Sequence, residues 1–92
     1  MIRNFSHKGV EEFFYTGGTK GIDATHARRL QERLDAMLAA ESLEDLNLPG
    51  WRLHQLKGDR AGTWSIKVTG AWRLTFQWDE TECVNVDYEQ YH

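Results

Sequence analysis

The chain has 92 residues, of which 40% are hydrophobic and 27% charged, and its net charge of −3 at pH 7 argues against a broadly basic nucleic-acid-binding protein. This length favours one small domain with one core, over residues 1–92. The single cysteine, Cys83, excludes an internal disulfide, and no apolar run is long enough for a signal peptide or a membrane helix, so we expect a cytoplasmic protein with no membrane partner.

The first third of the chain predicts a short strand, a short helix and a loop. Residues 1–5 alternate imperfectly and indicate the strand, and residues 10–15 indicate the helix. The helix residues expected to face inward are Val10, Phe13 and Phe14. Residues 16–21 ("TGGTKG") lack the glycine–lysine–hydroxyl order of a phosphate loop and predict a flexible connection.

An amphipathic helix is the clearest element of the sequence, and Asp23 is expected to cap it. Its apolar positions are Ala27, Leu30, Leu34, Met37 and Leu38. Its opposite face carries Arg28, Arg29, Glu32, Arg33 and Asp35. Further along, Ser42 and Asp45 resemble a capping box for one more turn, which Pro49 and Gly50 end.

After Pro49 the apolar pattern changes to the alternation of strands. Residues 63–69, 72–78 and 83–88 predict three strands, and residues 51–57 predict a weaker fourth. The side chains expected to face the helices are Trp64, Ile66, Val68, Trp72, Leu74, Phe76, Trp78, Val84, Val86 and Tyr88. Cys83 is expected on the other face. Trp51 lies outside the pattern, which leaves its placement open, and an exposed contact is one interpretation.

These elements predict an α+β fold with two N-terminal helices packed on a three- to four-stranded antiparallel sheet. Positive charge is concentrated in residues 51–75, which hold five Lys or Arg against one Asp, whereas residues 76–92 hold five acids and no Lys or Arg. Alternation places Lys67 and Arg73 on the face of the sheet away from the helices. From charge alone, a solvated sheet face is the preferred interpretation.

Cleavage of RNA by its own 2′-hydroxyl needs a base, an acid and cations that stabilise charge on the phosphate, and it needs no metal. The residues that offer these groups are His54, Lys57, Arg73, Tyr91 and His92. Each has an ordinary alternative as a surface or packing residue, and Arg73 has a possible ion-pair partner in Asp87 or Glu89. One cysteine and scattered histidines give no zinc spacing, so we expect no metal and no cofactor.

The stretch "LNLPGWRLHQLKGDRAGTWSIKVTGAWRLTFQW" and the terminal "YEQYH" resemble the HigB toxins of the RelE/ParE superfamily. The pattern "LHxLKGDRxGxWSIxVxxxWRLTF" is long and specific, and the preceding helices also fit, so the resemblance covers nearly the whole chain. It implies a RelE-like fold and a ribosome-dependent mRNA endonuclease that cuts message in the decoding site. It also implies a helix-turn-helix, HigA-like antitoxin, through which alone operon DNA would be contacted.

Carried over position by position, the resemblance places the catalytic roles on His54, Lys57, Arg73, Tyr91 and His92. We assign substrate binding to Arg52, Arg60, Lys67 and Gln90. The family usually has an aspartate where this chain has Gln90, and glutamine neither accepts a proton at neutral pH nor orients a cationic imidazole through charge. Glu89 or the terminal carboxylate of His92 takes over that role, or activity is reduced. The acidic net charge is a second departure, since toxins of this superfamily tend to be basic.

Two functions of different classes therefore compete. In the first, the protein is an active endonuclease in which His92 is the base and His54 orients the RNA or donates a proton. The alternative is a catalytically weakened or inactive homologue that binds antitoxin or ribosome. Related folds that poison DNA gyrase are a third possibility, which the histidines argue against because that activity needs no general base. An unrelated interaction domain is disfavoured by the length of the motif.

Overall fold

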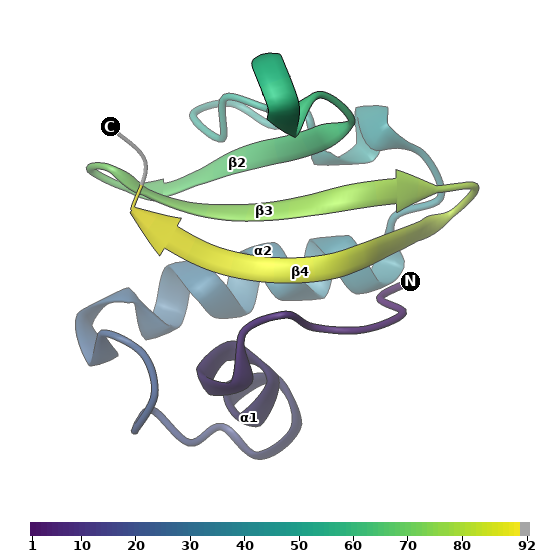
Figure 1. The fold of residues 1–92 in the computed structure, drawn as a ribbon. Helices are drawn as coiled ribbons and strands as arrows, with labels where there is room; N and C mark the ends of the chain where they lie inside the picture. Colours follow the sequence, from purple (N-terminus) through teal and green to yellow (C-terminus); the bar gives the residue numbers. More distant parts are fainter. Residues whose placement is uncertain (91–92) are drawn as a thin grey trace.

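A computed structural model of the chain describes residues 1–90, so Tyr91 and His92 lie outside the described residues. Two helices lie against one sheet whose strands follow chain order, β1-β2-β3-β4, with every neighbouring pair antiparallel (Figure 1). The elements are α1 (Lys8–Thr16), η1 (Ala24–His26), α2 (Ala27–Ala39), η2 (Leu43–Leu46), β1 (His54–Gln55), η3 (Gly58–Arg60), β2 (Thr63–Thr69), β3 (Trp72–Asp79) and β4 (Glu82–Gln90). The predicted α+β architecture is confirmed.

Within residues 1–90, no helix has the length and apolar character that a membrane span requires.

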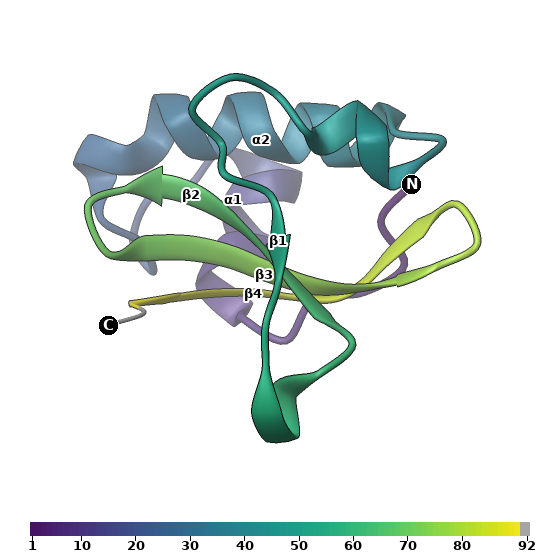
Figure 2. The same cartoon turned by 90° about the horizontal axis from the view of Figure 1, so that it is seen from above.

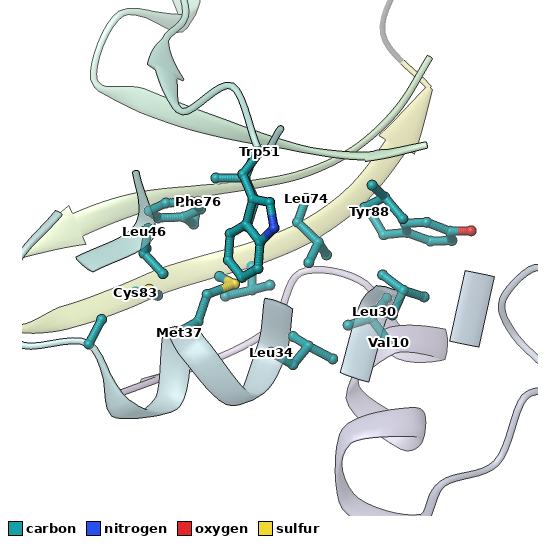
Figure 3. Packing of buried hydrophobic residues seen from close by; sticks show 14 of the residues in the cluster. Val10, Leu30, Leu34, Met37, Leu46, Trp51, Leu74, Phe76, Cys83 and Tyr88 are labelled. Carbon is teal, nitrogen blue, oxygen red and sulfur yellow. The ribbon is translucent and has the colours of Figure 1, made fainter. Parts of the chain in front are cut away.

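The core lies between the helices and one face of the sheet, and α2 runs behind that face in Figure 1. Its fully buried members come from both helices and from β2, β3 and β4, as the two apolar periodicities predict. They include Val10, Leu30, Leu34, Met37, Ile66, Leu74, Phe76 and Val86. In Figure 3, side chains of α2 meet those of the sheet at this interface. The opposite face of the sheet is therefore left for other functions.

The N-terminal segment runs beside β4 and covers the edge of the sheet. Its predicted strand is reduced to two isolated parallel bridges, Ile2 with Cys83 and Phe5 with Val86. Between them, Arg3 forms ion pairs with Asp79 and Glu82, at 2.6 and 2.8 Å. Covering an edge strand satisfies its unpaired backbone groups, which otherwise invite pairing with another chain.

Three side-chain placements on and near α2 differ from the prediction. Arg33 was expected outward but is buried, and Leu38 was expected inward but is 46% exposed. The guanidinium of Arg33 donates from Nε to the carbonyl of Lys67 at 2.7 Å and lies 4.7 Å from the centre of the Trp51 ring. Trp51, whose placement the sequence left open, is buried and is not an exposed contact (Figure 3). A long arginine stem packs against apolar surface while its head finds carbonyl and ring partners, which helical spacing alone does not reveal.

A bulge in β4 changes which of its alternating side chains face the core. Thr75 pairs with Asp87 but Gln77 pairs with Val84, so β4 has one more residue than β3 over this stretch. Asn85 sits there at φ 55°, and its backbone N–H donates to the side chain of Asn4 at 2.9 Å. An extra residue in a strand reverses which side chains face the core beyond it. Cys83 is therefore fully buried, and its predicted outward placement is wrong.

Burial lowers the reactivity expected of Cys83. Desolvation raises the pKa of its thiol to about 12, and the thiolate is the reactive form. We expect no alkylation of the native protein by iodoacetamide at pH 8 within an hour, and full alkylation in strong denaturant. Mass spectrometry after quenching measures both. Ready labelling of the native protein would contradict the structure at β4.

Candidate active site

The predicted cations lie on the face of the sheet away from α2. Lys67 in β2 is paired with Arg73 in β3, and His54 in β1 is paired with Ser65, two residues before Lys67. Residues paired across a ladder point to the same face, and so do residues two apart in one strand. Because Ile66 lies between Ser65 and Lys67 and belongs to the core, the imidazole and the two cations share the opposite face. We call this surface the open face.

His54 is held so that one ring nitrogen is available for proton transfer. Its side chain is exposed, and its Nδ1 lies 2.8 Å from the carbonyl oxygen of Arg52. A carbonyl only accepts hydrogen bonds, so Nδ1 carries the proton and Nε2 carries the lone pair of the neutral ring. Arg52 has φ 52°, a left-handed conformation that few non-glycine residues adopt. This arrangement suits a base or an acid that acts through Nε2.

Arg73 keeps its charge without a carboxylate partner among residues 1–90. Its Nη1 donates to the carbonyls of Gly70 and Trp72, at 2.8 and 3.1 Å, at the turn between β2 and β3. The alternative in which Arg73 pairs with Asp87 or Glu89 is therefore not what the structure shows. Carbonyl oxygens orient a guanidinium but do not neutralise it, so Arg73 remains suited to a phosphate.

Glu89 is already engaged. Its two carboxylate oxygens accept from Nη1 and Nη2 of Arg60 at 2.7 and 2.8 Å, and Oε2 also accepts from the hydroxyl of Thr75 at 2.6 Å. The Arg60 hydrogen bonds, followed by that of Thr75, lower the pKa of Glu89 despite its partial burial. A carboxylate that is held anionic and multiply bonded is poorly suited to accept a further proton. This counts against Glu89 as the replacement for the family's aspartate.

The other predicted site residues lie beside β1 or at the end of β4. Arg52 and Lys57 are exposed on either side of β1, and Lys57 immediately precedes η3. Gln90 is exposed and pairs with Trp72 at the end of β4. Tyr91 and His92 follow it, outside the described residues. Among residues 1–90 no group of three or more His, Cys, Asp or Glu is arranged to hold a metal ion.

A buried polar contact between His26 and Tyr88, to which the sequence analysis gave no role, lies beneath the end of β4. Nδ1 of His26 lies 2.6 Å from the hydroxyl oxygen of Tyr88, and the Tyr88 ring stacks on Trp72 with ring centres 4.5 Å apart. Both His26 and Tyr88 are buried. Because Trp72 is the partner of Gln90, this cluster underlies the last residues of β4. In the sequence, this contact was indicated only by the alternating position of Tyr88 and by the place of His26 near the start of a helix.

Comparison with known proteins agrees with this architecture. The chain resembles a YoeB/ParE toxin from Agrobacterium tumefaciens with a TM-score of 0.52 and 18% identity, over 100% of this chain and 95% of that one, which shows a shared fold. It is 42% identical to Endoribonuclease HigB of Proteus vulgaris over the full length of both chains. It is 31% identical to Toxin HigB-1 of Vibrio cholerae serotype O1 over 92% of each.

Two helices on a four-stranded antiparallel meander are the fold that this chain shares with the YoeB/ParE toxin. The family model for the RelE-like toxin HigB of type II toxin–antitoxin systems matches residues 3–92. The chain belongs to this HigB-like toxin family, whose members pair with an antitoxin.

Proposed function

We propose that this toxin is an endoribonuclease that cuts mRNA in the decoding site of the ribosome. The observation that carries the proposal is the open face, where His54 offers Nε2 and Arg73 offers a charge that no carboxylate of residues 1–90 neutralises. The name of the Proteus relative, an endoribonuclease at 42% identity, supports the activity. The net charge of −3 fits an enzyme whose substrate is presented by the ribosome rather than captured from solution.

The proposed reaction is an internal transfer of the phosphoryl group. His92 takes the proton of the 2′-hydroxyl, the 2′-oxygen attacks the adjacent phosphorus, and the bond from phosphorus to the 5′-oxygen breaks. His54 orients the RNA or protonates the leaving 5′-oxygen, and Lys57 and Arg73 stabilise the charged phosphorane. Tyr91 stacks on the nucleotide. The products are a 2′,3′-cyclic phosphate and a 5′-hydroxyl, and no metal or cofactor takes part.

The remaining assignments follow the same proposal. Arg52, Lys67 and Gln90 bind the RNA around the scissile phosphate, whereas Arg60 is already paired with Glu89. The protein acts in the cytoplasm, and a helix-turn-helix, HigA-like antitoxin holds it inactive and binds the operon DNA. A catalytically weakened binding protein is the second candidate, and Gln90 is the observation that favours it.

The substitution Gln90→Asp separates the two candidates. Purified protein with an unextended carboxyl terminus is added to ribosomes programmed with a defined mRNA, and the message ends are mapped. We expect cleavage at the codon in the decoding site, none without ribosomes, and a rate increase of about tenfold or more with Gln90→Asp, because a carboxylate orients and stabilises an imidazolium.

Thr19→Asp adds the same charge in an exposed loop before α2 and is the matched control, with no change expected. Failure of both the unmodified protein and Gln90→Asp to cut would exclude the endonuclease. The same proteins binding antitoxin or ribosome without growth arrest would then support the second candidate.

A further inference from the structure

Part of the open face is covered. Ser65 and Thr75 are paired residues on this face, yet they are only 1% and 2% exposed. Figure 2 shows the connection from β1 through η3 on the side of the sheet opposite α2. Leu56 within this connection is also buried, although it is not a member of the core between sheet and helices. The start of the connection therefore packs on the open face at Leu56, whereas residues 57–62, which include η3, are exposed.

One ion pair ties this connection to the far edge of the sheet. Arg60 belongs to the link between β1 and β2, whereas Glu89 belongs to β4, and β2 and β3 lie between. Neither of the two strands that the connection joins is a neighbour of β4 in the sheet. Both guanidinium Nη atoms contact the carboxylate, at 2.7 and 2.8 Å, and Glu89 is three-quarters buried. Such bidentate pairs fix orientation as well as distance.

The pair of Arg60 with Glu89 also keeps the Glu89 carboxylate from pairing with Arg73, which faces it across the strands. Glu89 is the direct cross-strand partner of Arg73, a position from which opposite charges normally pair. Instead Glu89 contacts Arg60 and Thr75, and Arg73 contacts the turn at Gly70. Without Arg60, Glu89 would be free to neutralise the cation proposed to hold the phosphate.

We infer that Arg60 and Glu89 are a positioning pair that seats the η3 connection, with Lys57 at its start, on the open face and keeps Glu89 away from Arg73. In this assignment Arg60 arranges the site and does not contact RNA. The expected effect of the pair on cleavage rests on the proposed function. The expected effect of the pair on the position of the connection does not depend on activity.

The test compares Glu89→Gln, Arg60→Ala and the double variant. We expect each single variant to lower kcat on programmed ribosomes roughly tenfold with little change in KM, because a displaced cation stabilises the phosphorane less well. The double variant should be no worse than Arg60→Ala, since residues that act as a unit are not additive. If Arg60 contacts RNA directly, Glu89→Gln would release it and raise activity. That increase would overturn the inference.

Amide hydrogen exchange gives a readout that needs no cleavage. The amides of Leu56 and Ala61 hydrogen-bond within the connection, to the carbonyls of Thr63 and Gly58 at 2.8 and 3.1 Å. We expect both to exchange faster in Glu89→Gln and in Arg60→Ala, with the α2 amides unchanged. Unchanged exchange in both variants would overturn the inference even if the protein cuts RNA. Faster exchange in a protein that cuts no RNA would sustain the seating of the connection and reject only the proposed function.

The matched control is the exposed ion pair of Arg28 with Glu32 on α2, at 4.0 Å. The substitutions Arg28→Ala and Glu32→Gln remove the same kinds of charge on the far side of the protein. We expect no effect on kcat or on exchange in the connection. An equal loss in this control would mean that charge removal alone lowers activity, and would also overturn the inference.

Discussion

The double variant His54→Ala/His92→Ala is expected to lose message cleavage, with a rate at least ~10²-fold below that of the unmodified protein. The expectation combines the exposed His54, whose Nδ1 is held by the carbonyl of Arg52, with the assignment of His92 as base. Each single variant should also lose activity, because proton removal and proton donation both limit phosphoryl transfer without a metal. Mapping message ends on programmed ribosomes measures the loss.

The same experiment includes its folding control. His54 is exposed, and within residues 1–90 its replacement removes one side-chain hydrogen bond, to the carbonyl of Arg52, so circular dichroism and the melting temperature should change little. Antitoxin binding should also persist. Retained cleavage in a folded double variant would remove the proposed acid–base mechanism, and the open face would then act only in binding.

Phe76→Ala is expected to have the largest effect on stability, about 3–5 kcal/mol. Phe76 is fully buried in β3, within the core between helices and sheet, and lies beside Leu46 in Figure 3. A domain of this size has only ~5–15 kcal/mol of stability, so this loss takes a large share of it. Denaturant unfolding monitored by tryptophan fluorescence gives the difference directly.

Leu38→Ala is the matched control for that substitution. Leu38 belongs to the predicted apolar stripe of α2, but its side chain is 46% exposed. We expect a change within about 0.5 kcal/mol, as for other surface positions. A loss comparable with that of Phe76 would mean that Leu38 packs inward, as its helical spacing alone predicted.

Apolar periodicity was sufficient to predict the class of fold. The spacing of Leu30, Leu34 and Met37 predicted α2, and the alternation around Ile66 and Leu74 predicted two strands with the correct inward face. Both patterns reflect local geometry, since side chains repeat every 3.6 residues in a helix and every two in a strand. The same alternation placed Lys67 and Arg73 together on the open face.

Other features depend on contacts between distant parts of the chain. The bulge at Asn85 reversed the phase of β4, which no count of alternating residues anticipates. Arg33 is buried because the carbonyl of Lys67 and the ring of Trp51 meet it there. An amphipathic pattern shows which residue types share a face, but not which partners tertiary packing supplies.

The candidate site, too, was predicted in part from the sequence and in part decided by the tertiary structure. Residue chemistry and family resemblance selected His54, Lys57, Arg73, Tyr91 and His92, and these catalytic roles stay predictions. Only the fold decided which nitrogen of His54 is available and that Glu89 pairs with Arg60 instead of the facing Arg73. Strand register and the path of the η3 connection set these choices, and both arise from contacts between residues far apart in sequence.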